Sequence, residues 1–250
     1  MKGILLVSVL FFVLVSGVSA NPEIYQRLDT SSYQLFVRNL SSLEAICSAA
    51  AYWTNGKTTR LLTAGHCVVD ESVRYALTND GLNFREANIL LRGWKAGSGM
   101  RFSWRSLLKG LPNLRAISTY NGMDVSLGDW AILEVKGKFE TIPIGDSKIL
   151  KMGDELFAIG YPIGGDKMAT RGIVGNPAYL APGFPWDGYI GANIPALPGN
   201  SGTAIVNTKG EMVAILVAGV GDNLHLLTPI SLVRERAKCL SDEICPESKP

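Results

Sequence analysis

Most apolar segments of this chain are short, rich in Val, Ile and Leu, and interrupted by Gly, Asn, Asp or Pro. Examples are RLLTAGHCVV, DWAILEVKG, ELFAIGYPIGG and MATRGIVG. Because short apolar runs bounded by turn-forming residues are typical of strands in antiparallel sheets, this pattern predicts an all-β sandwich or barrel. No internal repeat at a fixed period accompanies it.

Two stretches predict more definite local structure. GTAIVNTKGEMVAILVAGV, residues 202–220, predicts a β-hairpin, because two strand-like runs flank a turn around residues 207–210. SLVRERAKCL, residues 231–240, has the mixed polar and apolar faces of a helix. Thr228 is expected to cap this helix, with Pro229 at its first helical position.

The N-terminus has the layout of a secretory signal peptide. Lys2 is followed by an apolar block and by small residues that end at Ala20. The block is shorter than the ~20 residues that a membrane-spanning helix needs. We therefore expect a signal peptide over residues 1–20 and a secreted product, extracellular or periplasmic, with no membrane span.

The remaining 230 residues (250 minus 20) can form one large domain or two small barrels. VKGKFETIPIGD, near residues 136–146, resembles a connector between two groups of strands. The sequence thus predicts an N-terminal β-barrel half over residues 21–140. A C-terminal half over residues 141–250 would carry the terminal helix and a tail.

Charge is nearly balanced once the leader is removed, with 23 basic residues (24 minus Lys2) and 22 acidic ones. Such a balance argues against a dedicated nucleic-acid-binding protein. One segment, residues 87–123, contains six basic residues, two Trp and no acidic residue. We interpret it as a solvated loop with inward-packed Trp side chains; the alternative is a patch for an anionic partner.

Four cysteines remain after leader removal, and an even count in an exported chain favours disulfides. Of three possible pairings, we favour Cys47–Cys67 and Cys239–Cys245, whose members are close in sequence. The chain lacks the usual C-x2-C and H-x3-H spacings of zinc sites, and it has no C-x-x-C redox motif. We expect neither a metal nor any other cofactor.

Amide hydrolysis needs a nucleophile and donors for the oxyanion, and PALPGNSGTAIV, residues 195–206, offers both. Ser201 is the candidate nucleophile. Glycines on both sides of the Asn-Ser pair allow the sharp backbone turn that converging amides require. The amides of Gly199 and Ser201 are the candidate oxyanion donors.

A base and an acid complete such a site. His66 is the candidate base, because its ordinary pKa suits proton transfer near neutral pH and Gly65 allows close backbone approach. Asp129, which opens the apolar run of DWAILEV, is the candidate carboxylate that orients the imidazole. Asp124 is the competitor, with a shorter and less regular flanking strand.

TAGHC, DWAIL and GNSG, in the order His, Asp, Ser, resemble the three motifs of chymotrypsin-fold serine proteases. GYPIGG, TRGIVG and LTPISLV further resemble the trypsin-like bacterial branch of high-temperature-requirement proteases, although no PDZ-like extension follows. The resemblance implies two six-stranded antiparallel barrels. His66 and Asp129 would come from the first barrel and Ser201 from the second, with Cys47–Cys67 bracing the histidine loop.

The same resemblance implies peptide-bond hydrolysis through an acyl-enzyme, with a protein or peptide as substrate. Val217, Ala218 and Gly219 would lie beside the primary substrate pocket. Pro195 stands where trypsin-like enzymes carry a pocket Asp, so we expect a small or medium apolar residue before the scissile bond.

Four residues depart from the family pattern, and two of them, Thr203 and Ala204, replace its usual Gly-Pro after the serine. Asn200 replaces an Asp that pairs with a new N-terminus in digestive relatives, so we expect no zymogen switch of that kind. Val217 replaces a Ser that supports the catalytic Asp, and Thr203 brings a stiff β-branched side chain next to the turn.

Two other functions compete with a protease. One is a catalytically inactive secreted binding protein on the same fold. The other is an α/β-hydrolase esterase using Ser201, Asp222 and His225, which the compressed spacing and the lack of G-x-S-x-G disfavour. We interpret His225 as structural or exposed, and the sequence leaves the oligomeric state open.

Overall fold

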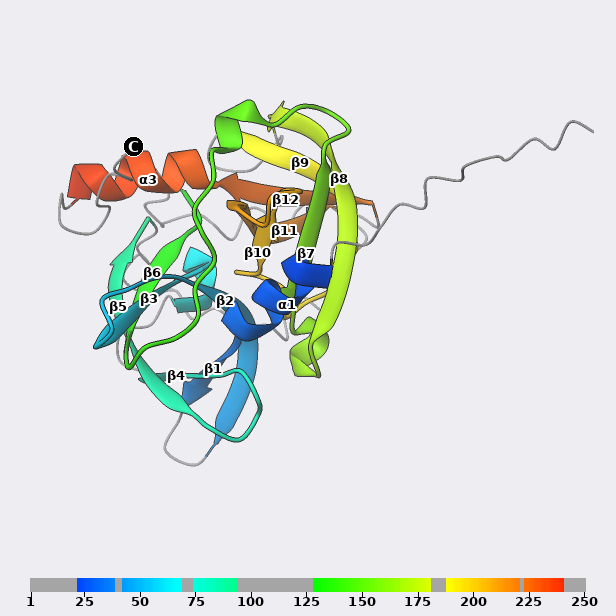
Figure 1. Cartoon of the computed structure of the whole chain (residues 1–250). Helices are drawn as coiled ribbons and strands as arrows, with labels where there is room; N and C mark the ends of the chain where they lie inside the picture. Colours follow the sequence, from blue (N-terminus) through cyan, green and yellow to red (C-terminus); the bar gives the residue numbers. More distant parts are fainter. Residues whose placement is uncertain are drawn as a thin grey trace, which may run out of the picture.

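A computed structural model gives the fold of the chain (Figure 1). It describes residues 22–38, 42–68, 74–93, 128–180, 188–220 and 223–240. Residues 238–240 are described by their backbone only. The predicted signal peptide, Asp124, Asp222, most of the basic segment and the Cys239–Cys245 pairing lie outside the described residues or side chains.

The first half of the described chain forms a closed six-stranded barrel, seen at the lower left of Figure 1. All its strand pairs are antiparallel, in the order β1-β2-β3-β6-β5-β4. Its strands are β1 (Ser32–Arg38), β2 (Leu43–Thr54), β3 (Thr58–Thr63), β4 (Arg74–Thr78), β5 (Arg85–Arg92) and β6 (Ala131–Lys136).

The second half forms another closed six-stranded antiparallel barrel, at the upper right of Figure 1. Its strands are β7 (Glu155–Gly160), β8 (Met168–Tyr179), β9 (Tyr189–Asn193), β10 (Ala204–Val206), β11 (Met212–Val220) and β12 (Leu224–Pro229). Their order, β7-β8-β9-β12-β11-β10, repeats that of the first barrel. The all-β prediction is confirmed, and the repeat is one of topology rather than of sequence.

The predicted hairpin is present between β10 and β11. Ile205 pairs with Ala214, and the turn between the strands closes with the Gly210 N–H donating to Asn207 O at 2.9 Å. Both strands are buried along most of their length, which explains why they read as continuous apolar runs rather than as an alternating pattern.

Two α-helices accompany the barrels. α3 (Ile230–Leu240) continues directly from β12 and matches the predicted terminal helix, but Pro229, expected at its first position, is the last residue of β12. α1 (Pro22–Ser31) is not predicted from the sequence; it buries Ile24 and Leu28, and the ring of Tyr25 packs edge-on against that of Phe157 at 5.7 Å. α1 thus covers β7 at the front of the view in Figure 1.

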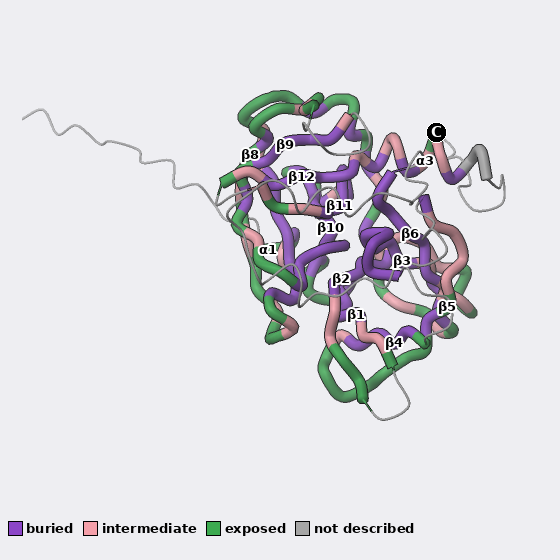
Figure 2. The backbone as a smooth tube through the Cα atoms, turned by 180° about the vertical axis from the view of Figure 1, so that it is seen from behind, coloured by how far each residue is buried: buried purple, intermediate pink, exposed green. Residues whose placement is uncertain are grey.

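The interior is continuous between the two barrels. Buried residues follow the strands β2, β3, β6, β10 and β11, and exposed ones lie at the outer turns and along β8 (Figure 2). One apolar cluster contains residues of α1, both barrels and α3, and a second one fills the remaining side of the second barrel. The two barrels therefore cannot separate without exposing apolar surface.

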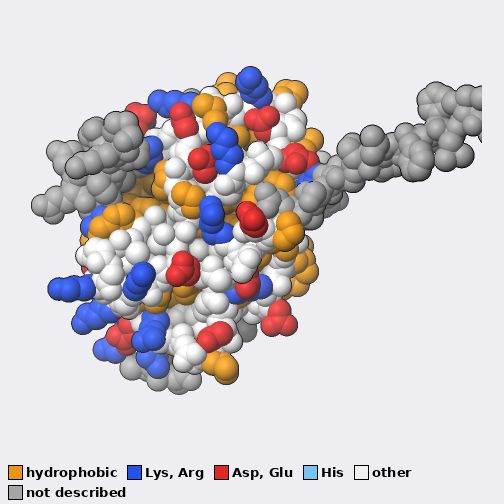
Figure 3. All heavy atoms as spheres, viewed as in Figure 1, with side chains coloured by type: hydrophobic (Ala, Val, Ile, Leu, Met, Phe, Trp, Pro, Cys, Tyr) orange, Lys and Arg blue, Asp and Glu red, His pale blue; other side chains and the backbone are white. Residues whose placement is uncertain are grey.

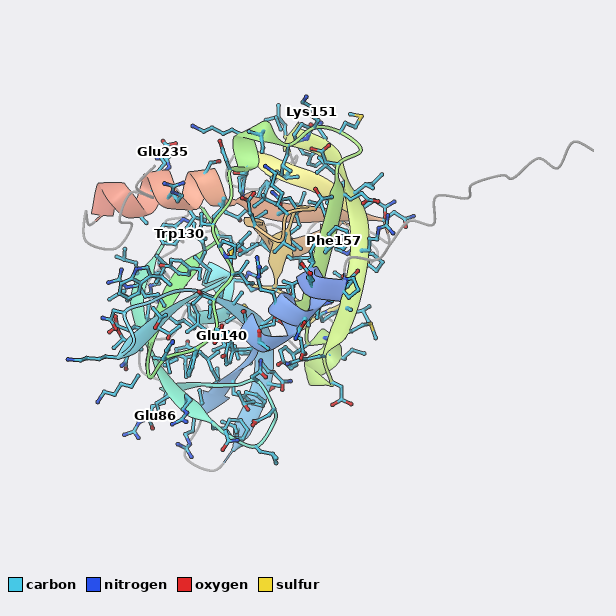
Figure 4. All side chains as sticks on the ribbon, viewed as in Figure 1. Glu86, Trp130, Glu140, Lys151, Phe157 and Glu235 are labelled. Carbon is cyan, nitrogen blue, oxygen red and sulfur yellow. A yellow bond between two sulfur atoms is a disulfide. The ribbon has the colours of Figure 1, made fainter. Side chains whose placement is uncertain are left out.

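Acidic and basic side chains are interspersed over much of the face in Figure 3. Near the lower edge, Glu86, labelled in Figure 4, lies 3.6 Å from Arg38 Nη1 and 3.8 Å from Arg74 Nη1. Arg92, in the described end of the basic segment, donates to Val68 O at 3.0 Å. Among the described helices, none is long and apolar enough to cross a bilayer.

Candidate active site

The candidate base lies just after β3, in the short 3₁₀ helix η1 (Gly65–Val68). The His66 side chain is 7% exposed. A disulfide joins Cys67 in the same short helix to Cys47 of β2, as the sequence predicts. The histidine loop is therefore tied covalently to a neighbouring strand of the first barrel.

Asp129, two residues before β6, contacts both the ring and the backbone of the histidine. Its Oδ2 lies 2.7 Å from His66 Nδ1, and its Oδ1 accepts from the His66 N–H at 2.9 Å. A Cβ at Gly65 would lie 3.0 Å from Trp130 N and 3.1 Å from Asp129 Oδ1, so glycine permits this approach. A carboxylate at Nδ1 favours the tautomer with its hydrogen on Nδ1, in which Nε2 is the nitrogen that can accept a proton.

The aspartate loop is held from the second barrel. Thr228, expected to cap α3, lies two residues before the first helical residue, and its hydroxyl donates to Asp129 O at 3.2 Å. Trp130 is fully buried and lies below α3 in Figure 4. A Cβ at Gly128 would lie 3.0 Å from Leu232 of α3, so the helix packs directly on this loop.

The serine loop, residues 196–203, depends on two glycines with left-handed backbone. Gly199 has φ +97° and Gly202 has φ +86°. A Cβ at Gly202 would overlap Ser48 O and lie 2.9 Å from Ala64 N, so the loop packs against the end of β3. Ser201 O lies 4.0 Å from Cys67 Sγ. The structure thus brings the serine loop against the histidine loop.

Ser48 of β2 connects the first barrel to the serine loop. Its N–H donates to Ser201 O at 2.8 Å, and its hydroxyl donates to Gly199 O at 2.9 Å. The same hydroxyl accepts from the Tyr161 N–H at 3.1 Å. This fully buried serine belongs to no sequence motif, and sequence reasoning missed it together with Thr228. Both act through contacts between residues far apart in the chain.

The backbone amides of Gly199 and Ser201, proposed as oxyanion donors, differ in their hydrogen bonding from the amide of Asn200 between them. The Asn200 N–H donates to Leu197 O at 3.0 Å. The Gly199 and Ser201 amides find no acceptor within the described part of the chain. Two amides that remain available on either side of a satisfied one are what an oxyanion site requires.

The strand expected to flank the substrate pocket is anchored to the serine loop. The Gly202 N–H donates to Leu216 O at 2.7 Å. A β-bulge follows at Val217, where the pairing of β11 with β12 shifts. Val217 is buried, Ala218 is half-buried and Gly219 is exposed. The bulge therefore turns the strand outward, from the core toward the surface.

Two departures from the family pattern, Asn200 and Thr203, leave the backbone of the serine loop regular but bury polar side-chain atoms. The Thr203 N–H donates to Asn200 O at 3.0 Å, and Thr203 O accepts from the Leu216 N–H at 3.0 Å, so the β-branched residue leaves the turn regular. Asn200 Oδ1 and Thr203 Oγ1 are buried near Gly160 and have no hydrogen-bond partner among the described residues.

Three possible metal ligands also meet at this site. Ligand atoms of Cys47, His66 and Cys67 lie within 4.8 Å of one another. Because the two sulfurs are bonded to each other, neither is the thiolate that a zinc site needs. The structure thus gives the two cysteines a covalent role beside the histidine.

Residues 48–215 match the family described as Trypsin-like peptidase domain. A "Probable periplasmic serine endoprotease DegP-like" of Pseudomonas putida (strain F1) is 41% identical over 88 residues, or 35% of this chain and 18% of that protein. A "Serine protease HtrA-like" of Staphylococcus haemolyticus is 30% identical over 140 residues, or 49% and 22%. The aligned parts thus span about a fifth of the length of these relatives.

Among solved structures, "HtrA-type protease AlgW with decapeptide" resembles this chain with a TM-score of 0.63 and 16% sequence identity. The alignment covers 88% of this chain and 67% of that one. The similarity supports the chymotrypsin-like fold that the two barrels and the terminal helix display. The family match spans His66, Asp129 and Ser201, and the chain belongs to the trypsin-like peptidase family.

Proposed function

We propose that the chain is a secreted serine endopeptidase in which His66, Asp129 and Ser201 act as a catalytic triad. The observation that carries this proposal is the double contact of the Asp129 carboxylate, 2.7 Å from His66 Nδ1 and 2.9 Å from His66 N. This contact fixes the ring position and its tautomer at once.

In the proposed reaction, His66 takes the hydroxyl proton of Ser201 as the serine oxygen bonds to the substrate carbonyl carbon. The Gly199 and Ser201 amides donate to the resulting oxyanion. The imidazolium then gives its proton to the amine nitrogen as the C–N bond breaks. A water molecule, deprotonated by the same ring, attacks the acyl carbon, and the ring returns this proton to the Ser201 oxygen as the acyl C–O bond breaks and the acid product leaves.

Substrate preference follows from the surface formed by Val217, Ala218 and Gly219. Residue 195 is Pro in this chain, whereas trypsin-like relatives have at this position the Asp that binds Lys or Arg. We propose a small or medium apolar residue before the scissile bond. A peptide panel cleaved fastest after Arg would contradict this.

Export is part of the proposal. The leader-like residues 1–20, the disulfide between Cys47 and Cys67 and the periplasmic relatives named above all support an extracellular or periplasmic product. Fractionation of expressing cells, with N-terminal sequencing of the product, tests both the location and a cut after Ala20.

Casein hydrolysis by the wild type and by Ser201→Ala tests the activity. We expect the variant to lose at least about 10⁴-fold in kcat, and a fluorophosphonate to label the wild type alone. Ser147→Ala, which removes a buried hydroxyl bonded to Ser231 Oγ at 2.7 Å, is the matched control and should keep both signals. A wild type that folds but is neither labelled nor active would favour the inactive binding protein.

A further inference from the structure

The second histidine of the chain is buried and has no role in the proposed triad. His225 lies on β12, between Gly219 of β11 and Ala192 of β9 in the barrel sheet (Figure 1). His225 is 5% exposed. Its Nδ1 is buried and has no hydrogen-bond partner among the described residues. A polar group in this state needs an explanation.

The missing side chain at Gly219 uncovers one edge of this ring. A Cβ at position 219 would lie 3.3 Å from both Cδ2 and Nε2 of His225. Gly219 itself is exposed, and the bulge at Val217 turns this part of β11 outward. A ligand group that packs on Gly219 therefore meets the Nε2 edge of the imidazole.

Both segments around this ring lead directly to Ser201. β11 is joined to the serine loop by the bond from the Gly202 N–H to Leu216 O at 2.7 Å. A hydrogen bond between the backbone of Ala196, at the start of the serine loop, and the ring opposes the lowering of the His225 pKa by burial. The ring therefore lies beside two segments that are both connected to the serine loop.

We propose that His225 determines substrate specificity by exchanging a hydrogen bond with the side chain before the scissile bond. The ring already occupies the space under Gly219, so the side chain must be short. It must also be uncharged and carry a hydroxyl or amide, as Thr, Ser and Asn do. This proposal rests on the proposed peptidase activity, and it replaces the apolar preference inferred from Pro195 by a polar side chain of similar size.

The charge state of the ring supports an uncharged partner. Burial lowers the pKa of His225, against a weaker opposing effect of the Ala196 backbone, so the ring is neutral at neutral pH. A neutral imidazole has one donor and one acceptor. Hydroxyl and amide groups match either tautomer, because they also donate and accept. A carboxylate can only accept, so it would bond a single tautomer, and its charge would lose water beside a neutral ring.

Two peptides that differ only in Thr or Val before the scissile bond test the proposal, since these side chains have the same shape. We expect kcat/KM of the wild type to favour Thr by about tenfold, the value of one hydrogen bond of ordinary net strength. His225→Leu should abolish or reverse this ratio, and His225→Gln, which keeps a donor and an acceptor, should retain part of it.

The proposal is overturned by a wild type that prefers Val or by a Thr/Val ratio of kcat/KM that His225→Leu leaves unchanged. It is also overturned if an Asp peptide is cleaved best at neutral pH. The Kd values of the same peptides for Ser201→Ala, measured by calorimetry, give the ratio without turnover, and equal values also contradict the proposal. Fluorophosphonate labelling of the wild type separates the proposed role of His225 from the proposed peptidase activity. Labelling with a Thr/Val ratio of one refutes the role of His225 alone, whereas no labelling refutes the peptidase.

Discussion

The disulfide between Cys47 and Cys67 offers a quantitative test of how the histidine loop is held. Replacing both cysteines by alanine deletes a cross-link between residues 20 positions apart. A closed loop of that length restricts the unfolded chain by about 3 kcal/mol at 25 °C. Both residues are buried, so lost packing adds to this value. We expect the free energy of unfolding to fall by about 3 to 4 kcal/mol.

Urea unfolding of the wild type and the double variant, followed by Trp fluorescence, measures this loss from the two midpoints. The substitution is preferable to a reducing agent, which would also reduce a bond between Cys239 and Cys245. The rate of Ser201 labelling, measured well below the unfolding temperature, reports the site itself. We expect it to stay within about tenfold, because Asp129 still positions His66.

Two results would refute this reasoning. A loss below about 1 kcal/mol would mean that the cross-link does not restrain the unfolded chain as its length requires. A double variant that is folded at the assay temperature but labels Ser201 more than about a hundredfold more slowly would contradict a purely bracing role. The sulfur pair would then be needed for the geometry of the reacting groups.

Three further perturbations test the serine loop and the core. Ser48→Ala leaves Gly199 O and the Tyr161 N–H without their partner, so we expect a loss of about 2 to 4 kcal/mol in unfolding free energy and slower Ser201 labelling. Wild-type labelling would contradict that role. Gly202→Ala should give insoluble or unlabelled protein, because its Cβ would overlap Ser48 O at a left-handed backbone position; soluble, fully labelled protein would refute the packing. Burial raises the pKa of Tyr33 to about 12. The neutral phenol therefore makes its full contribution to the free energy of unfolding below its unfolded pKa of about 10. This contribution is lost between pH 10 and about 12. Urea midpoints should fall less over that range in Tyr33→Phe, and equal falls would contradict the shift.

The sequence predicts the elements whose signal is local. The hairpin of β10 and β11, the start of β6 after Asp129 and the helix α3 all follow from apolar runs and nearby turn residues. α1 is missed because ten residues with few apolar side chains carry a weak periodic signal, and packing on β7 stabilises it. The repeated barrel topology leaves no sequence period, because only the order of strand pairing is repeated.

Candidate site residues follow a similar division. The motif residues are identifiable because the proposed chemistry requires His, Asp and Ser side chains and glycine at fixed neighbouring positions. Ser48 and Thr228 are not, because their roles depend on hydrogen bonds to Ser201 O and Asp129 O across the barrel interface. Backbone acceptors place no demand on the neighbouring sequence, so contacts of this kind emerge only from the fold.

Each barrel supports the part of the site that belongs to the other. Ser48 of the first barrel holds the Ser201 carbonyl, and Thr228 of the second holds the Asp129 carbonyl. A nascent chain with one folded barrel therefore has neither loop secured, and the proposed activity emerges only when the halves dock. If the chain is exported as proposed, unfolded copies of it would meet no active enzyme until both halves of a neighbouring copy have docked.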